Sequence, residues 1–189
     1  MCGDEIGEVD TLKVLQTGKR VYLRHPVPSD AEEFLAMIRT SRRLHRPWVY
    51  PPSTEEAIES YIKRAWSERH AGCLICLRRT DEIAGVASLS EIVRGVFQSA
   101  YLGFYGNAQH TGQGLMKEGV QLLLRHAFRE MRLHRVEANV QPQNVRSRAL
   151  VRSLGFRKEG FSPRYLKIGG RWRDHERWTL LVEDWKARR

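Results

Sequence analysis

The segment Gln109-His110-Thr111-Gly112-Gln113-Gly114 most constrains what this chain can fold into. A strand-like run ends near Tyr105, and a long amphipathic helical stripe begins near Gly114. Glycines at such a join let the backbone bring its N–H groups close to a ligand, and the helix N-terminus adds unpaired donors and partial positive charge. The segment therefore predicts a phosphate cradle, with a simple tight turn as the alternative. It is neither a Walker loop, since no G-K-[ST] follows, nor a dinucleotide fingerprint, since no βαβ unit surrounds it.

Hydrophobic periodicity predicts one mixed α+β domain. The expected order is β-α-α-β-β-β-α-β-α-β-β, with one central, mostly antiparallel sheet of about seven strands and helices on both faces. Capping boxes at 29–32 and 53–56 are expected to begin the first two helices. Residues 1–18 lack a clear period and are predicted to be a loose N-terminal lead-in to a domain over 19–189. The strands are expected at 20–24, 73–78, 83–92, 96–105, 135–140, 159–168 and 171–181. The later helices are expected at 114–131 and, after Asn144 as N-cap, at 145–154.

The composition excludes several classes of protein. The 189 residues fit one domain, and a hydrophobic content of 41% is too high for a disordered chain. The acidic N-terminus lacks the apolar region of a signal peptide, and no apolar run approaches the roughly 18 residues that span a bilayer. We therefore expect a soluble, cytoplasmic protein with no membrane partner.

Cys73 and Cys76 have the C-x-x-C spacing found in redox and zinc sites. They lie in a short apolar run that is predicted to be a strand, where positions three apart point to opposite faces. The sequence therefore favours two buried, small apolar side chains over a redox pair, and it predicts no metal site.

The net charge of +10 lies entirely in the last third of the chain. Residues 1–124 carry 15 basic and 15 acidic side chains, whereas residues 125–189, the basic third, carry 17 and 7. Most of the excess is arginine, whose planar guanidinium suits phosphates and carboxylates. A solvated face, attraction of a polyanionic cofactor, and contact with a ribosome or RNA all explain this excess, and charge alone does not choose among them.

Two motifs resemble the GNAT superfamily of acetyl-CoA-dependent N-acetyltransferases. The run Q-x-x-G-x-G at 109–114 is similar to the signature between the fourth strand and third helix of that fold. Asn144 at the start of the next helix, followed by Leu154-Gly155-Phe156, resembles the next motif. Within the superfamily, the chain is most similar to ribosomal-protein-alanine N-acetyltransferases of the RimJ/RimL type. The matching stretches lie within about residues 20–185, at 93–95, 101–103, 112–116, 133–135, 155–160 and 170–175.

The resemblance implies both a site and a mechanism. In the family fold the strands expected here at 96–105 and 135–140 splay apart, usually with a bulge in the first, and acetyl-CoA lies in the opening. A backbone N–H stabilises the oxyanion, and the amine attacks the thioester directly, with no covalent enzyme intermediate. The implied cofactor-binding residues are Phe104, Tyr105 and Gly106 at the thioester, Gln109, Thr111, Gly112, Gln113, Gly114 and Leu115 at the pyrophosphate, and Asn144 at the pantetheine arm.

Candidates for the acid and the base follow from the chemistry of the amine. An α-amine has a pKa of roughly 7.7–8.0 and a lysine amine about 10.4, so an enzyme that acts on α-amines needs only a modest base. The candidate bases are Glu137, on the polar face of strand 135–140, and Glu159, just after helix 145–154, with pairing to an arginine as their alternative role. Ser147 is the candidate acid for the leaving thiolate, with helix capping as its alternative, and Tyr165 is a second candidate.

The acceptor that the resemblance implies is the N-terminal alanine of a ribosomal protein, with the basic third as a possible ribosome contact. Stretch 42–52 is where the family shapes the acceptor pocket, so His45 and Trp48 are candidate substrate contacts. Asp174 and His175 look like a catalytic pair, but neighbouring strand residues point to opposite faces, so Asp174 is assigned a structural or substrate-edge role. A small-molecule or peptide-antibiotic amine is one alternative acceptor. A non-catalytic ribosome- or RNA-binding protein is the alternative from another class.

Overall fold

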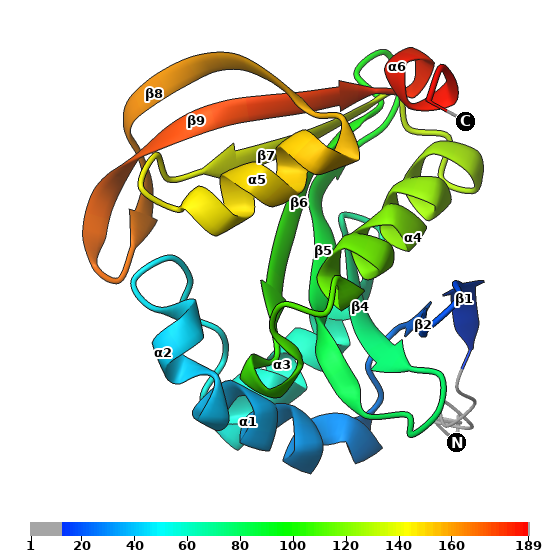
Figure 1. The fold of residues 1–189 in the computed structure, drawn as a ribbon, viewed down its shortest axis with the longest axis vertical. Helices are drawn as coiled ribbons and strands as arrows, with labels where there is room; N and C mark the ends of the chain where they lie inside the picture. The colour runs from blue at the N-terminus through cyan, green and yellow to red at the C-terminus, as the bar shows by residue number, and fades with distance from the viewer. Residues whose placement is uncertain (1–12, 189) are drawn as a thin grey trace, which may run out of the picture.

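Nine strands form one sheet in the computed structural model, which describes residues 13–188 (Figure 1). Their order across the sheet is β1-β2-β4-β5-β6-β7-β9-β8, and the short β3 pairs with β4. β6 and β7 are parallel, and the other strand pairs of the described residues are antiparallel, as predicted. The bounds are β1 Val14–Thr17, β2 Val21–Arg24, β3 Trp66–Ser67, β4 His70–Leu77, β5 Ile83–Val93, β6 Ser99–Gly106, β7 Arg135–Val140, β8 Arg157–Ile168 and β9 Arg171–Leu181.

Helices cover both faces of the sheet. α4 and α5 pack on one face, where Leu123, Val151 and Leu154 join the larger core cluster. α1 and α3 pack on the opposite face, where Phe34 and Ile58 join a second cluster. The helices are α1 Ala31–Thr40, α2 Arg42–His45, α3 Glu55–Ala65, α4 Leu115–Arg129, α5 Val145–Leu154 and α6 Val182–Lys186, with short 3-10 turns at Pro28–Asp30 and Ala108–His110. None of these helices is long and apolar enough to cross a membrane.

The alternation of side chains along β4 explains how one sheet supports two cores. Cys73 and Ile75 belong to the cluster under α4, whereas Leu74 and Cys76 belong to the cluster under α1 and α3. Cys73 and Cys76 are buried and free, and burial raises the pKa of the Cys73 thiol to about 12 and of the Cys76 thiol to about 11. The prediction that the two thiols are inert apolar side chains on opposite faces is confirmed.

The N-terminal part of the fold departs from the predicted elements. Residues 14–17, assigned to the loose lead-in, form β1, which pairs with β2. The rest of the lead-in, residues 1–12, lies outside the described residues. The predicted boundary between the lead-in and the domain, at residue 19, therefore separates two strands that pair with each other. The structure also adds α2, a single turn that sequence periodicity did not predict.

The predicted capping box at 29–32 is wrong. α1 has no side-chain cap, because both carboxylate oxygens of Asp30 are committed elsewhere. They accept from the guanidinium of Arg24, and one also accepts from the N–H of Val27 at 2.7 Å. The second capping prediction holds in part, since Thr54 caps α3 through the N–H of Ala57.

Candidate active site

The sheet splits between its two parallel strands. β6 pairs with β7 only where Ser99–Tyr101 faces Arg135–Glu137. Beyond these pairs β7 stays with β9 as far as Val140, so it diverges from the rest of β6 (Figure 1). The predicted splay is therefore confirmed, and Leu102 to Gly106 form one wall of an opening in the sheet.

The predicted bulge in β6 is wrong. From Tyr101 to Gly106, β6 follows β5 without a register shift. The irregularity lies in β5 between Ser90 and Val93, where Glu91 has a φ of 48°. The opening thus arises because β7 follows β9, and no extra residue in β6 is needed.

Backbone directions along β6 decide which amides reach the opening. The N–H of Asn107 donates to the carbonyl of Ala84 in β5 at 2.9 Å. Because successive residues direct their backbone groups to opposite sides of a strand, Tyr105 also faces β5, and Phe104 and Gly106 face the opening. The Gly106 carbonyl agrees with this direction, since Nε2 of His45 in α2 lies 2.8 Å from it.

The glycine-rich segment forms a tight, open turn before α4. Asn107 starts the turn by accepting from the N–H of Gln109 at 3.0 Å. Gly112 and Gly114 then adopt φ values of 81° and 75°, in the left-handed region that L side chains avoid. A Cβ added at Gly112 would meet nothing within 4 Å, so the backbone here is open to a ligand. This open backbone at the start of the 15-residue α4 has the geometry of an anion cradle.

A contact that the sequence did not predict fixes this turn to the N-terminal strands. The Arg20 guanidinium donates through Nη1 to the carbonyl of Gln113 at 2.7 Å and through Nε to Oε2 of Glu118 at 3.0 Å. The backbone N–H of Arg20 also donates to Oε1 of Glu118 at 2.7 Å. Burial alone would raise the pKa of Glu118, but these hydrogen bonds outweigh burial and lower it. Residues 20 and 118 are far apart in sequence, so periodicity gives no sign of the pair.

We expect Glu118→Gln to destabilise the protein in a pH-dependent way. A carboxylate whose folded pKa is lowered contributes stability above its unfolded pKa of about 4.3, and the contribution is lost as the pH falls through the folded value. Because Arg20 is half-exposed, the loss should be about 1 kcal/mol near pH 7. Denaturant unfolding from pH 3 to 7 measures it, with the exposed Glu59→Gln as control. The difference in free energy of unfolding between the wild type and Glu118→Gln should shrink as the pH falls. A difference that stays constant would contradict a stabilising role for the charged Glu118 carboxylate.

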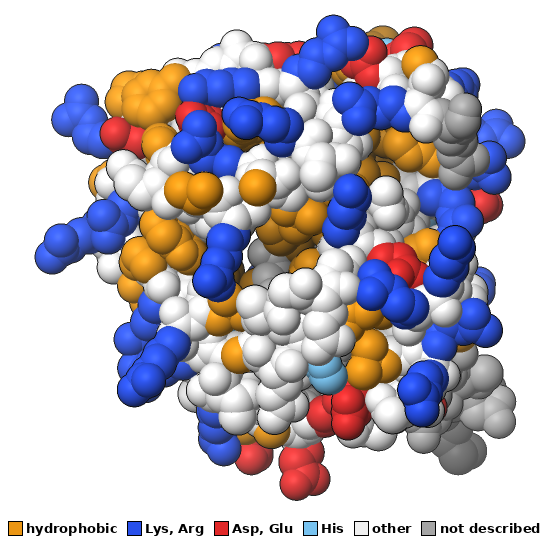
Figure 2. Space-filling model, viewed as in Figure 1, with side chains coloured by type: hydrophobic (Ala, Val, Ile, Leu, Met, Phe, Trp, Pro, Cys, Tyr) orange, Lys and Arg blue, Asp and Glu red, His pale blue; other side chains and the backbone are white. Residues whose placement is uncertain are grey.

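A cleft of about 610 Å³ lies along the open turn and the splay. Among residues 13–188 its walls include Arg43, Lys117 and Arg146 and no Asp or Glu, so the cleft suits an anionic ligand. Figure 2 shows this face of the molecule hollowed near its centre and bordered by Lys and Arg side chains. The predicted cofactor residues that line it are Phe104, Tyr105, Gly106, Thr111, Gly112, Gly114, Leu115 and Asn144. Gln109 and Gln113 do not line it.

The start of α5 forms the opposite wall of the cleft. Asn144 caps the helix through Oδ1, which accepts from the N–H of Ser147 at 3.1 Å. Both residues line the cleft, so the capping role of Ser147 and its predicted place at the site coexist. The side-chain NH₂ of Asn144 remains a donor on the wall of the cleft.

A smaller cavity of about 90 Å³ lies inside the splay itself. It shares Trp48, Phe104, Asn144 and Ser147 with the large cleft, so the two spaces meet between β6 and β7. The residues that line only the smaller cavity are Leu102, Ala138, Asn139, Val140, Gln141 and His175. No acidic side chain from the described part of the chain lines it.

Residues 42–52 help to close this smaller cavity. The carbonyl of Trp48 accepts from Nε2 of Gln141 at 3.2 Å. The predicted substrate contacts His45 and Trp48 both lie on the wall of the large cleft. Burial lowers the pKa of His45, so its ring is neutral near pH 7.

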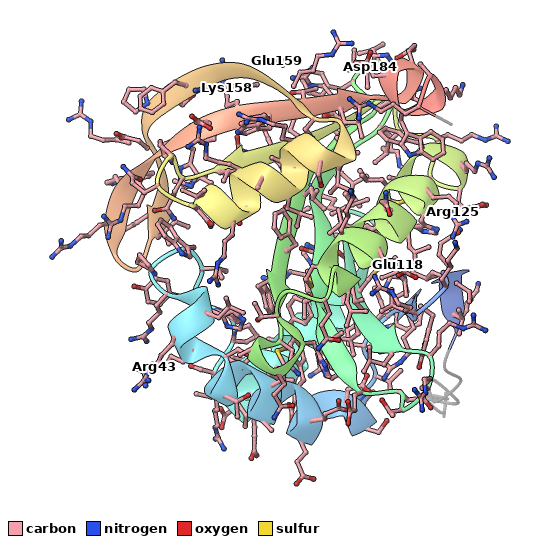
Figure 3. The ribbon with its side chains drawn as sticks, in the orientation of Figure 1. Arg43, Glu118, Arg125, Lys158, Glu159 and Asp184 are labelled. Carbon is pink, nitrogen blue, oxygen red and sulfur yellow. The ribbon has the colours of Figure 1, made fainter. Side chains whose placement is uncertain are left out.

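Glu137 and Glu159 lie together in an ion network and line neither cavity. Glu137 accepts from Nε of Arg135 at 2.7 Å, and Glu159 accepts from Nη2 of the same guanidinium. Thr179 also donates to Glu159, at 3.0 Å. The hydrogen bond from Arg135 is the main cause that lowers the pKa of Glu159. Figure 3 shows Glu159 on the edge strand β8, so the structure supports the arginine-pairing alternative for both carboxylates.

Asp174 and His175 point to opposite sides of β9, as expected. Oδ1 of the exposed Asp174 accepts from the N–H of Arg164, whereas His175 is 3% exposed and lines the smaller cavity. Strand alternation could place His175 relative to Asp174, but only the tertiary fold brings it to Asn144 and Ser147. Among residues 13–188 no three His, Cys, Asp or Glu side chains lie close enough to hold a metal ion.

Comparisons with known proteins agree with this geometry. Residues 20–157 match the acetyltransferase (GNAT) domain family model. The chain is 32% identical over 175 residues, 88% of its length, to the probable N-acetyltransferase YjcK of Bacillus subtilis, of which it covers 97%. It is 44% identical over 104 residues to the [ribosomal protein uS5]-alanine N-acetyltransferase of Escherichia coli, a match over 55% of this chain and 54% of that one.

Solved structures show the same fold. Mycobacterium smegmatis RimJ in complex with CoA-disulfide superposes with a TM-score of 0.80 at 28% identity, over 92% of this chain and 86% of that chain. A RimL structure, described as a ribosomal L7/L12 alpha-N-protein acetyltransferase, has a TM-score of 0.81 at 19% identity, over 91% of this chain and 99% of that chain.

Proposed function

Because this chain belongs to the GNAT family of N-acetyltransferases, we propose that it transfers the acetyl group of acetyl-CoA to the N-terminal α-amine of a protein. The acceptor that we propose is the N-terminal alanine of a ribosomal protein. The observation that carries the proposal is the meeting of a large cation-lined cleft with a small uncharged cavity at the splay of the sheet. Such a pair of spaces suits a polyanionic acyl donor on one side and a small amine on the other.

The cleft residues fit coenzyme A. We assign the pyrophosphate to the open backbone between Gln109 and Leu115, because the positive-φ glycines and the start of α4 form an anion cradle there. Asn144 would donate to the pantetheine arm. When bound, acetyl-CoA supplies an activated acyl group as a thioester.

The residues at the splay would position the reaction. The N–H groups of Phe104 and Gly106 face the opening, and one of them would stabilise the oxyanion that develops during attack. Ser147, on the wall of both spaces, would donate to the leaving sulfur. Direct attack by the amine needs no covalent enzyme intermediate.

The size and charge of the smaller cavity support an α-amine with a small side chain. Its volume of about 90 Å³ favours alanine or serine over bulky residues. The absence of Asp and Glu from its walls disfavours polycationic acceptors such as polyamines. The similarity to the uS5-alanine enzyme, which spans about half of each chain, supports the same acceptor class.

The basic third could also dock the enzyme on a ribosomal particle. Arginines on β8 and β9, such as Arg164, Arg171 and Arg177, are exposed. Docking through such charges should weaken as salt rises, while acetylation of a free peptide should not. Binding to a ribosomal precursor that is unaffected by salt would contradict docking.

The test of the proposed function is a titration calorimetry measurement with acetyl-CoA, followed by thiol release with peptides that start with Ala, Ser or Met. Binding with turnover on the Ala peptide supports both the activity and the acceptor. Binding of acetyl-CoA without thiol release on any peptide would contradict the protein acceptor and favour a small-molecule or peptide-antibiotic amine as the acceptor. No binding would contradict the catalytic role and favour a ribosome- or RNA-binding protein.

A further inference from the structure

We propose that His175 is the general base of the transfer, with Nε2 of its ring taking the proton from the acceptor amine. The inference rests on the proposed function, because it assigns the smaller cavity to that amine. His175 lines this cavity together with Asn144 and Ser147, which also line the cofactor cleft.

The position of His175 follows from the alternation of β9. Trp178 and Leu180 face the core under α4 and α5. His175 lies an odd number of residues from both, so its side chain leaves the sheet on the opposite face. The ring therefore approaches the splay from the side opposite α5, while Asn144 at the start of α5 approaches it from the other. An amine and a thioester would meet between them.

A backbone hydrogen bond fixes the tautomer of the ring. Nδ1 of His175 lies 2.9 Å from the carbonyl oxygen of Arg173. A carbonyl only accepts, so Nδ1 must carry the proton. In the neutral ring Nε2 then has a free lone pair and can only accept. The strand thus presents the imidazole in the form that a base requires.

The surroundings of the ring keep it neutral. Burial is the main cause that lowers the pKa of His175, and the bond to Arg173 and the charge of Asp174 oppose it. Tyr165 faces the ring from β8 with centroids 6.2 Å apart, and Trp48 and Asn139 share its cavity. A lowered pKa means that the basic form persists below pH 6.5 and is lost only as the pH falls through the lowered value.

The proposed step conserves atoms and charge. The ammonium group gives one proton to Nε2 of His175, and the freed lone pair of nitrogen forms the C–N bond. As the C–S bond breaks, its electron pair goes to the sulfur. The Ser147 hydroxyl donates its proton to that sulfur and receives a second proton from nitrogen in its place. The products are an amide, a thiol and an imidazolium, which returns its proton to water.

Glu137 and Glu159 are placed less well for this step. Both carboxylates accept hydrogen bonds from Arg135, and neither lines the cavity. The hydrogen bond from Arg135 lowers the pKa of Glu159 and makes that carboxylate a weaker base, because the cation favours its charged form. His175 has no such cation among its hydrogen-bond partners in the described part of the chain.

The first test compares His175→Gln with the matched control His126→Gln. His126 is another imidazole whose pKa is lowered by burial, but it lines neither cavity. With an Ala-starting peptide at saturation, kcat of His175→Gln should fall about 10-fold at pH 7, because only the neutral fraction of the α-amine, roughly a tenth, then reacts. His126→Gln should keep the wild-type kcat, and both variants should keep the wild-type Kd for acetyl-CoA. Wild-type kcat in His175→Gln would overturn the proposal, as would an equal loss in His126→Gln.

The pH profile separates a base from a merely structural histidine. Wild-type kcat should stay level from pH 8 to below 6.5. In His175→Gln it should decline below the pKa of the α-amine, about 7.7–8.0, because only the neutral amine then reacts. Glu137→Gln and Glu159→Gln should keep the wild-type profile. If kcat of only one of these two variants declined below the pKa of the α-amine, the carboxylate removed in that variant would be the base.

A spectroscopic readout tests His175 without turnover. Ring ¹⁵N resonances, assigned by their loss in His175→Gln, should show a neutral Nδ1–H tautomer at pH 7. Addition of CoA and an Ala-starting peptide should shift them and leave those of His126 unchanged. If the wild type acetylated no amine, the proposed function would fail, yet these shifts would still support His175 at the amine site. A charged ring at pH 7, or a ring unaffected by peptide, would overturn the inference.

Discussion

Gly112→Asp is expected to abolish binding of acetyl-CoA, with Kd raised by at least about 100-fold, because like charges at close range cost several kcal/mol. The new carboxylate would stand at the open turn, where we assign the pyrophosphate. The φ of 81° at this position adds strain of about 1–2 kcal/mol for any L side chain. Titration calorimetry measures the affinity directly.

The fold should survive this change, so that the loss can be attributed to the site. A Cβ at Gly112 would meet nothing within 4 Å, and no packing is lost. Gly95→Asp is the matched control, because Gly95 has a φ of 66° and equally open surroundings in the turn between β5 and β6. It should share the strain and keep the affinity. Gly112→Ala should lose affinity to a smaller degree, since it adds strain without charge. Unchanged affinity in Gly112→Asp would remove the pyrophosphate from this turn.

Local patterns predicted the second half of the fold almost residue by residue. β7 has the predicted bounds, because alternation of Val136, Ala138 and Val140 with polar residues is decisive for a half-buried strand. α5 begins after Asn144 and ends at Leu154, just before Gly155 with its φ of 99°, because both caps act through neighbouring backbone groups. In such segments local and tertiary preferences agree.

Features that depend on distant partners could not be predicted in this way. β1 is short and half-exposed, so only its pairing with β2 makes it a strand. At the site, the glycine turn and Asn144 were found because their geometry is local. Arg20, Glu118 and the cavity position of His175 depend on contacts between segments far apart in sequence. Glu137 was placed on the correct face of β7, but the sequence could not show that Arg135 holds it.

Asp30 should be the most costly single carboxylate to remove. Its side chain is 8% exposed and accepts two bonds of 2.6 Å from the equally buried guanidinium of Arg24. It also holds the N–H of Val27 before α1. Loss of one partner leaves a buried, unpaired charge, which costs about 3–5 kcal/mol. Denaturant unfolding of Asp30→Ala should show this loss, while the exposed Glu32→Ala should stay near wild type.

Asp30→Asn decides between this ion pair and a capping role for Asp30, which occupies the N-cap position of α1. Asn caps helices about as well as Asp, so a capping role predicts little change. The ion pair predicts a loss close to that of Asp30→Ala, because an amide cannot neutralise Arg24. The double variant Arg24→Met with Asp30→Ala should recover much of the stability, since removing both charges also removes the unpaired one. A harmless Asp30→Asn with no recovery in the double variant would support a capping role for Asp30 and contradict the buried pair.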